Sequence, residues 1–132
     1  LGRIISSLQK PVWFSAHFNH PQEITPITRK QISKWVSMGI PFLNQSVLLR
    51  GVNDSSTVLK ELFLSLIEIK VKPYYLHQAD MVQGTSHLRV SPKRGLQILK
   101  EIQGDLPGYA IPHYVQDRSD GSGKIPLQNK WT

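Results

Sequence analysis

The feature that most restricts the fold of this chain is the alternation of apolar, strand-like runs with amphipathic, helix-like segments. The runs that read as strands are 11–16, the middle of 40–49, 71–76 and 109–115. A helix-like segment separates each run from the next, so similar units follow one another at intervals of roughly 25–35 residues. This spacing is typical of parallel β-α-β units with right-handed connections. The sequence therefore predicts an α/β fold with a parallel sheet.

The helix-like segments carry recognisable start and stop signals. Thr25-Pro26 places a capping hydroxyl before a proline at the first helical position, and Ser91-Pro92 does the same for the last helix, which Gly104 ends. In the middle helix, apolar residues recur at i, i+3, i+4 and i+7; they are Leu59, Leu62, Phe63 and Leu66. Each helix is therefore expected to bury one face against the sheet.

The length of the chain limits how much of a barrel it can form. It has 132 residues, whereas a closed β/α barrel takes roughly 250. Near the amino terminus, Ile4, Ile5 and Leu8 look like the end of an amphipathic helix. We therefore expect one small domain, or part of one, that starts in mid-fold.

The charge balance is basic but patternless. Sixteen Lys and Arg residues face nine Asp and Glu residues, which gives a net charge of +7. The basic residues form no run or stripe, so we predict no nucleic-acid partner; the excess charge equally suits a phosphate-bearing cofactor.

No apolar run reaches about 18 residues and residues 1–10 do not read as a signal peptide, which predicts no membrane association and a cytoplasmic protein. The absence of cysteine excludes disulfides and thiolate metal sites.

The segment 117–124 contains two glycines and ends in Lys124. Its glycines allow positive φ and a close approach of the backbone to a ligand. A glycine-rich loop that ends in lysine suggests either a phosphate cradle or a lysine that forms a Schiff base with an aldehyde cofactor. The phosphate-loop motif would need glycine at Arg118 and a hydroxyl at Ile125, so it does not fit. An exposed basic turn without a function is the alternative.

Polar side chains occur along or just after the predicted strands. His17 follows the first strand, Gln45 lies in the second, Asp80 follows the third and Asp117 follows the fourth. Because function in parallel β/α folds collects at the carboxyl ends of the strands, we expect these residues to share one rim with Lys124. Two carboxylates there could hold a cationic substrate. Taken singly, each aspartate could be a turn or cap residue, and Gln45 could belong to a core hydrogen-bond network.

The histidines also raise the possibility of a metal site. His17 and His20 lie three residues apart, and His77 and His87 are further candidates. This spacing is weak support, and no acidic residue completes an H-E-x-x-H helix. We predict no metal site and interpret His17 as a polar contact to a ligand.

Five motifs carry a family resemblance that no single one would support. They are His17-Phe18-Asn19-His20-Pro21, the run 44–54 (Asn-Gln-Ser-Val-Leu-Leu-Arg-Gly-Val-Asn-Asp), Pro73-Tyr74-Tyr75, Gln83-Gly84-x-x-His87 and the run 117–126. In this order they resemble the carboxyl-terminal half of lysine 2,3-aminomutase, a family that joins radical S-adenosylmethionine chemistry to pyridoxal phosphate. The resemblance implies the carboxyl-terminal part of a partial TIM-type barrel. Residues 1–108 would form its second half, and residues 109–132 its last strand and the pyridoxal phosphate lysine loop.

The resemblance also implies roles for the rim residues. Lys124 matches the lysine that forms the Schiff base with pyridoxal phosphate. Asp80 and Asp117 match the carboxylates that hold the side-chain ammonium of the substrate, and His17 and Gln45 match residues around bound S-adenosylmethionine. The implied reaction is an isomerisation that moves the α-amino group of L-lysine to the β-carbon. Since the neutral amine is the nucleophile, we expect a partly buried Lys124 with a lowered pKa.

The chain departs from the family pattern in its lack of cysteine. The family holds an iron–sulfur cluster with a three-cysteine motif in its amino-terminal half, so this chain could reach a cluster only through that missing half. Ser55 stands where the family has a zinc cysteine, which argues against zinc.

The resemblance implies L-lysine as substrate, a missing amino-terminal half or complementary chain as partner, a homo-oligomer when complete, and no activity for the chain alone. Two alternatives stay open: an aminomutase of the elongation-factor β-lysylation type, and a non-catalytic remnant or a piece of a split enzyme.

Overall fold

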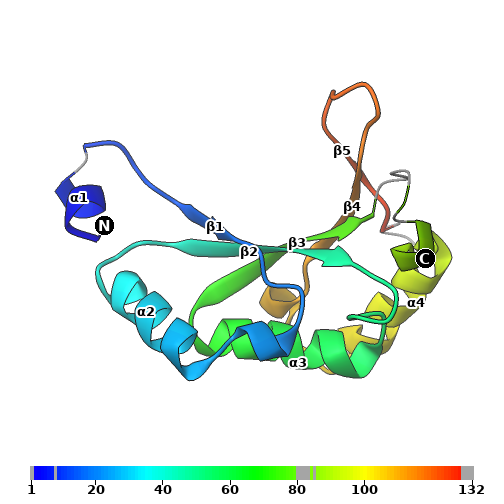
Figure 1. Ribbon diagram of the computed structural model, residues 1–132, viewed down its shortest axis with the longest axis horizontal. Coiled ribbons are helices and arrows are strands. Elements are labelled where there is room, and N and C mark those ends of the chain that lie inside the picture. Colours follow the sequence, from blue (N-terminus) through cyan, green and yellow to red (C-terminus); the bar gives the residue numbers. More distant parts are fainter. Residues whose placement is uncertain (1, 8, 80–83, 85, 129–132) are drawn as a thin grey trace.

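The computed structural model describes residues 2–7, 9–79, 84 and 86–128. They form one five-stranded sheet with helices along one of its faces (Figure 1). The strands are β1 (Phe14–Ala16), β2 (Phe42–Leu48), β3 (Val71–Gln78), β4 (His113–Asp117) and β5 (Lys124–Pro126). The helices are α1 (Gly2–Ser7), α2 (Pro26–Ser37), α3 (Ser56–Glu68) and α4 (Pro92–Gln103), with short 3-10 turns η1 (Pro21–Glu23), η2 (Ser86–Leu88) and η3 (Gly108–Ala110).

The strand order confirms the predicted parallel winding. The strands lie side by side in the order in which they occur in the chain, and β1 to β4 are parallel. Their register aligns Ala16 with Asn44, Val47 with His77, and His77 with Val115. The carboxyl ends of these strands therefore meet along one edge of the sheet.

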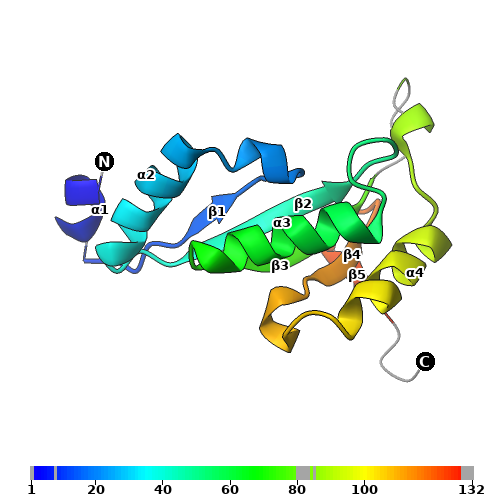
Figure 2. The same cartoon turned by 90° about the horizontal axis from the view of Figure 1, so that it is seen from below.

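The three long helices all cover the same face of the sheet (Figure 2). Each begins at a capping hydroxyl, Thr25, Ser55 or Ser91, which accepts a hydrogen bond from the backbone N–H three residues further on. The apolar face of α3, expected from its spacing, is the centre of the core: all four of its buried side chains have no exposed surface, and burying each contributes about 1.5–3 kcal/mol. Helix packing thus leaves the opposite face of the sheet free of helices.

The fourth strand begins later than predicted. Tyr109 lies in the turn η3, and β4 starts at His113, directly after Pro112. Proline has no N–H to donate to a sheet ladder, so the strand forms only beyond it. The prediction of a strand over 109–115 was therefore wrong in its first half.

Lys124 lies in a strand and not in a loop. It is the first residue of β5, which pairs antiparallel with β4 and places Lys124 directly opposite Asp117. The turn between them is closed by a 2.8 Å hydrogen bond from the N–H of Arg118 to the carbonyl of Gly123. Positive φ at Gly121 (75°) and Gly123 (124°) allows this tight return. The glycines expected to approach a ligand here serve the turn of a hairpin.

The third strand is longer than predicted and includes His77 and Gln78. The buried amide of Gln78 donates a 2.6 Å hydrogen bond to the carbonyl of Val90 and accepts one from the hydroxyl of Tyr114. Burial raises the pKa of Tyr114 to about 12, against a smaller opposite effect of the Arg89 charge. Because the polar side chain of Gln78 has hydrogen-bond partners, β3 extends past the predicted end at Leu76, and His77 belongs to the sheet.

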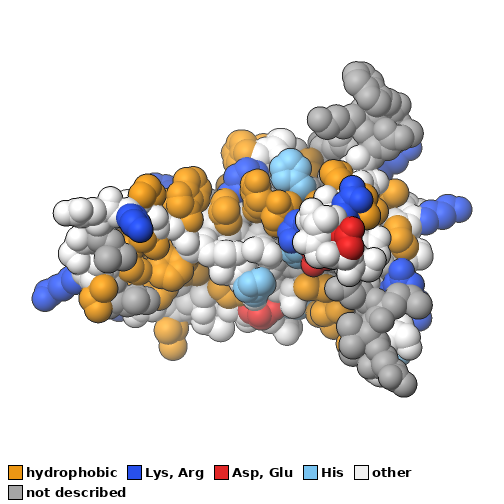
Figure 3. Space-filling model, turned by 90° about the horizontal axis from the view of Figure 1, so that it is seen from above, with side chains coloured by type: hydrophobic (Ala, Val, Ile, Leu, Met, Phe, Trp, Pro, Cys, Tyr) orange, Lys and Arg blue, Asp and Glu red, His pale blue; other side chains and the backbone are white. Residues whose placement is uncertain are grey.

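Figure 3 looks onto the helix-free face, where histidine and apolar side chains lie among charged and uncharged polar ones. Along β2 the buried and half-buried residues alternate, with Phe42, Asn44, Ser46 and Leu48 towards the helices. Gln45 and its alternate neighbours therefore point to the helix-free face, called here the open face. None of the helices in the described ranges is long and apolar enough to cross a membrane.

Candidate functional site

The loop after β1 is tied to β2 by buried polar side chains. Asn44 accepts a 2.8 Å hydrogen bond from the N–H of Phe18 and donates a 3.2 Å bond to its carbonyl. The same carbonyl accepts a 2.6 Å bond from the hydroxyl of Ser46. The loop that carries His17 is therefore held against the second strand by side chains that never reach the open face.

Asn53 connects three backbone segments and has no exposed surface. Its oxygen accepts a 2.8 Å hydrogen bond from the N–H of Leu49, and its nitrogen donates to the carbonyls of Asn19 (2.8 Å) and Val47 (2.9 Å). Asn19 in turn accepts a 2.8 Å bond from the N–H of Val47. These bonds fix the carboxyl ends of β1 and β2 together, a structural role that sequence reasoning missed.

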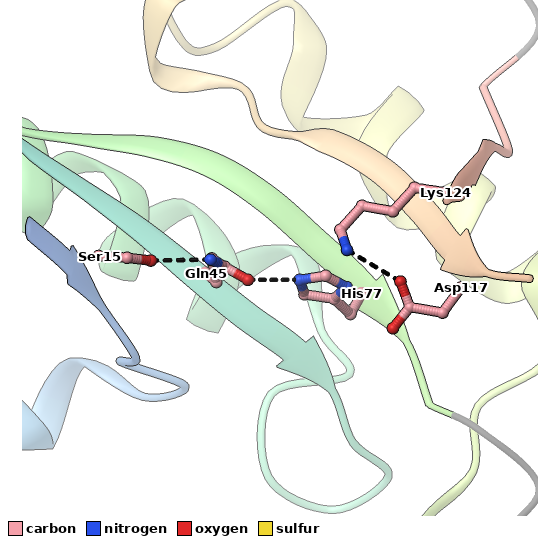
Figure 4. Close-up of polar contacts among 5 residues, drawn as sticks. All are labelled: Ser15, Gln45, His77, Asp117 and Lys124. Carbon is pink, nitrogen blue, oxygen red and sulfur yellow. Dashed lines mark hydrogen bonds and ion pairs between the residues drawn. The ribbon is translucent and has the colours of Figure 1, made fainter. Parts of the chain in front are cut away.

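A row of hydrogen bonds crosses the open face from β1 to β3 (Figure 4). The amide nitrogen of Gln45 donates a 2.7 Å hydrogen bond to the hydroxyl of Ser15, and its oxygen lies 2.9 Å from Nε2 of His77. Since the amide nitrogen is used towards Ser15, the oxygen accepts and Nε2 of His77 carries the proton. Gln45 is thus held by side chains on both neighbouring strands, and the hydroxyl hydrogen of Ser15 is left to donate.

The row Ser15–Gln45–His77 was not foreseen. Sequence reasoning placed Gln45 in the site but overlooked Ser15 and did not pair His77 with Gln45. Alternate side chains of a strand lie on the same face of a sheet, so once β1 and β3 are placed beside β2, this alternation puts Ser15 and His77 on the same face as Gln45.

An ion pair forms the rim of the open face beyond this row. Nζ of Lys124 lies 2.9 Å from Oδ1 of Asp117 and 5.4 Å from the ring centroid of Tyr75. Figure 4 shows His77 between Gln45 and this pair. The hydrogen bond from Lys124 is the main cause that lowers the pKa of Asp117, helped by the charges of Lys124 and His77.

The expectation of a lowered pKa for Lys124 was wrong. The hydrogen bond to Asp117 is the main cause that raises the pKa of Lys124; desolvation opposes it, and the charges of Asp117 and Tyr75 add to the rise. The side chain keeps 34% of its surface exposed, so burial does not favour the neutral amine. In this arrangement Lys124 is a protonated partner of Asp117.

The remaining predicted residues are not joined to this row. His17 follows β1 and is exposed, and within the described part of the chain its side chain makes no hydrogen bond or ion pair. Asp80 lies outside the described residues. The structure thus brings Gln45, Asp117 and Lys124 to one face, with His77 between them.

The described residues contain no group of three or more His, Cys, Asp or Glu side chains placed to hold a metal ion. The open face offers the amine of Lys124, the carboxylate of Asp117, and hydroxyl, amide and imidazole groups. These groups can bind a cation, form a Schiff base, or donate hydrogen bonds to a polar ligand.

The fold is similar to that of a solved radical SAM methyltransferase from Sphaerobacter thermophilus. The match has a TM-score of 0.63 at 19% identity and covers 97% of this chain but 42% of that chain. Together with an α/β sheet whose described strands end in open edges at β1 and β5, this confirms the predicted partial barrel.

Sequence comparison gives a more specific result. No protein-family model matches the chain. It is 44% identical over 126 residues to the L-lysine 2,3-aminomutase of Methanococcus maripaludis and 41% identical over 121 residues to that of Fusobacterium nucleatum. It is also 42% identical over 117 residues to the glutamate 2,3-aminomutase of Clostridioides difficile. These matches cover 94%, 92% and 89% of this chain.

The chain spans only 29%, 28% and 28% of the length of these three relatives. The similarity thus extends over almost all of this chain but leaves most of each relative unmatched. The chain belongs to the lysine 2,3-aminomutase family, as a carboxyl-terminal fragment.

Proposed function

We propose that this chain forms the carboxyl-terminal part of a radical S-adenosylmethionine aminomutase that converts L-lysine to β-lysine with pyridoxal phosphate. The observation that carries the proposal is the Asp117–Lys124 pair, an amine and a carboxylate 2.9 Å apart at the rim of the open face. The printed names of the relatives support the reaction class, and the radical SAM fold supports the use of S-adenosylmethionine.

Lys124 fits the role of the residue that binds the cofactor aldehyde. It is a primary amine, it is reachable from solvent, and its neighbour Tyr75 offers an aromatic face. The ion pair with Asp117 must open first, because a protonated amine is not a nucleophile. When bound, pyridoxal phosphate supplies a conjugated ring that stabilises the migrating centre, and S-adenosylmethionine supplies the hydrogen-abstracting radical.

Asp117 fits the role of the group that recognises the substrate's side chain. Its carboxylate already binds an alkylammonium, that of Lys124 at 2.9 Å, and the ε-ammonium of a lysine substrate is the same kind of group. Once Lys124 is engaged elsewhere, Asp117 is free to bind the ε-ammonium of L-lysine, with Asp80 as the second carboxylate. A glutamate substrate, suggested by the Clostridioides difficile relative, would bring like charges together at this point.

Gln45 and His17 are proposed to face S-adenosylmethionine. Gln45 is pre-oriented by Ser15 and His77, so a ligand meets a fixed amide. The chain has no thiolate to hold an iron–sulfur cluster, and the ligands of that cluster belong to the part of the barrel that this chain does not contain.

The test is borohydride reduction in the presence of pyridoxal phosphate, followed by peptide mapping. It is carried out on the chain joined to the preceding part of the Methanococcus maripaludis relative. The label is expected on Lys124 and is lost in Lys124→Arg. Lys72 is the matched control, because burial lowers the pKa of Lys72 and so favours its neutral, reactive amine. Labelling that survives Lys124→Arg, or that falls on Lys72, would refute the assignment.

Turnover separates the candidate reactions. Conversion of L-lysine without conversion of L-glutamate supports the proposed substrate. Activity only on a lysine attached to an elongation factor would favour the β-lysylation type of enzyme. A correctly labelled protein without any turnover would be a non-catalytic remnant.

A further inference from the structure

The Pro73-Tyr74-Tyr75 motif lies at an irregularity in the strand β3. Asn44 of β2 pairs with Pro73 and Gln45 pairs with Tyr75, so Tyr74 is an extra residue and forms a β-bulge. Proline has no N–H for a sheet ladder and occurs within sheets at edges or bulges. Since β3 has a strand on each side, the bulge is the place where this proline is tolerated.

The bulge brings the rings of Tyr74 and Tyr75 into contact. Buried and half-buried residues alternate along β3 except at these two neighbours, which are both half-buried. Their ring centroids lie 4.6 Å apart, edge to face, and Tyr74 meets the ring of His113 in the same manner at 5.5 Å. Edge-to-face contacts of this kind restrict the orientation of aromatic side chains. The ring of Tyr75 is therefore fixed by its aromatic neighbours.

This fixed ring is a second partner for the ammonium group of Lys124. Nζ of Lys124 lies over the ring of Tyr75, 5.4 Å from its centroid, and 2.9 Å from Oδ1 of Asp117. An aromatic face attracts a cation at this distance, although more weakly than a carboxylate does. Lys124 thus has a strong partner on β4 and a weaker one on β3.

Two ammonium groups compete for Asp117 in the proposed reaction. One belongs to Lys124, and the other is the ε-ammonium of the L-lysine substrate. When the substrate occupies Asp117, Lys124 loses its carboxylate partner but keeps the ring of Tyr75, which belongs to a different strand from Asp117. The ring then keeps Lys124 close to the place where it must meet the cofactor aldehyde again after the product leaves.

We propose that Tyr75 is a positioning residue, which holds the side chain of Lys124 while Asp117 binds the ammonium group of the substrate. The inference rests on the proposed function, because it concerns the exchange of Lys124 and substrate at the same site. The face of the ring makes this contact and the hydroxyl does not. Tyr75→Phe should therefore preserve the role, and Tyr75→Leu should abolish it.

The first experiment needs neither cofactor nor substrate. It uses the fused protein, which is this chain joined to the preceding part of the Methanococcus maripaludis relative. Lysines are labelled with 13C at the ε-carbon, and the NMR signal that Lys124→Arg removes is that of Lys124. Asp117→Asn removes the carboxylate partner, so Lys124 should move further onto the ring and its ε-protons should shift upfield through ring-current shielding. Adding Tyr75→Leu to Asp117→Asn should abolish this shift, whereas adding Tyr75→Phe should keep it.

The second experiment measures turnover of L-lysine by the reconstituted fused enzyme. Tyr75→Leu should lower kcat by roughly two- to fivefold, the range that corresponds to an exposed cation–aromatic contact. The KM for L-lysine should change less than about twofold, because Asp117 still binds the substrate. Tyr75→Phe should restore kcat. Tyr109→Leu is the matched control, since Tyr109 lies in η3 and is 60% exposed; it should change kcat less than about 1.5-fold.

The proposal is overturned if Tyr75→Leu behaves like Tyr75→Phe in either experiment, or if Tyr109→Leu lowers kcat as much as Tyr75→Leu. The borohydride label tests the proposed function separately. A label that misses Lys124 refutes the proposed function. A label on Lys124, combined with equal behaviour of Tyr75→Leu and Tyr75→Phe, refutes only the role of Tyr75.

Discussion

The two faces of the sheet hold polar side chains in different ways. On the helix-covered face, Asn44 and Asn53 bond mainly to backbone groups and are shielded from water. On the open face, Gln45, His77 and Lys124 bond to other side chains and stay partly exposed. Bonds to the backbone define where the chain runs, whereas bonds between side chains can be exchanged for bonds to a ligand. We therefore expect substitutions on the covered face to reduce stability and those on the open face to reduce binding.

The largest loss of stability is expected from Asn53→Ala. It leaves the N–H of Leu49 and the carbonyls of Asn19 and Val47 without their partner in a buried place. Each unsatisfied group costs about 1–3 kcal/mol, so with three such groups the free energy of unfolding should fall by at least about 3 kcal/mol. Urea denaturation measures this loss, and the neighbouring Asp54→Ala, which removes one exposed bond to the N–H of Gly51, is the control. A loss at Asn53 no larger than that at Asp54 would contradict the structural role of Asn53.

Gly95→Ala should have the next largest effect. A Cβ at Gly95 would fall 2.2 Å from the hydroxyl oxygen of Tyr114, which is itself bonded to Gln78. Overpacking costs about 1–3 kcal/mol and exceeds the gain of up to about 1 kcal/mol in helix propensity. Gly104→Ala is the control, because nothing lies within 4 Å of a Cβ there, and it should not destabilise the protein. If Gly95→Ala were as stable as Gly104→Ala, the packing of Tyr114 against α4 would be wrong.

Prediction from the sequence succeeded where a structural feature depends on residues that are close together in the chain. The helix starts at Thr25 and Ser91 depend on residues a few positions away, so local signals were sufficient. The parallel winding followed from the spacing of the units. The extension of β3 depends on a contact with a later segment, the bond from Gln78 to Val90, and no local pattern encodes it. The antiparallel return of β5 is local, but its two glycines were interpreted as a ligand loop and not as a hairpin turn.

The candidate site was predicted only in part for the same reason. Family motifs gave the residue types, including Gln45, Asp117 and Lys124, but not their pairing. That Lys124 faces Asp117 follows from the hairpin register, and that Gln45 meets Ser15 and His77 follows from the order of the strands. The pKa of Lys124 was predicted in the wrong direction because it depends on this pairing.

The comparison of Gln45→Ala with Asn44→Ala tests the two faces at adjacent positions. Asn44 is buried and bonded to Phe18 and Ser46, so its loss should cost about 2–4 kcal/mol of stability. Gln45 is on the open face and its loss should cost no more than about 1 kcal/mol, since water can replace its bonds. In the fused protein, Gln45→Ala should weaken the binding of S-adenosylhomocysteine at least about tenfold, measured by calorimetry. Equal losses of stability at both positions would remove the distinction between the faces.

The smallest effect on stability is expected at the rim pair, and it should depend on pH. The pKa of Asp117 is lowered in the folded state, so its contribution is present above the ordinary carboxyl pKa and is lost as the pH falls through the lowered value. The pKa of Lys124 is raised, so its contribution is present below the ordinary amine pKa and is lost as the pH rises through the raised value. The pair therefore stabilises the fold between these limits, weakly because both groups are exposed. In Lys124→Gln the pKa of Asp117, followed by carboxyl NMR, should rise towards its ordinary value.

The reciprocal variant, Asp117→Asn, should lower the pKa of Lys124 and speed its reaction with pyridoxal phosphate at neutral pH, because more of the amine is neutral. If Asp117→Asn slowed this reaction instead, Asp117 would be a part of the cofactor site, and its proposed role as the group that binds the substrate's ammonium would have to be replaced.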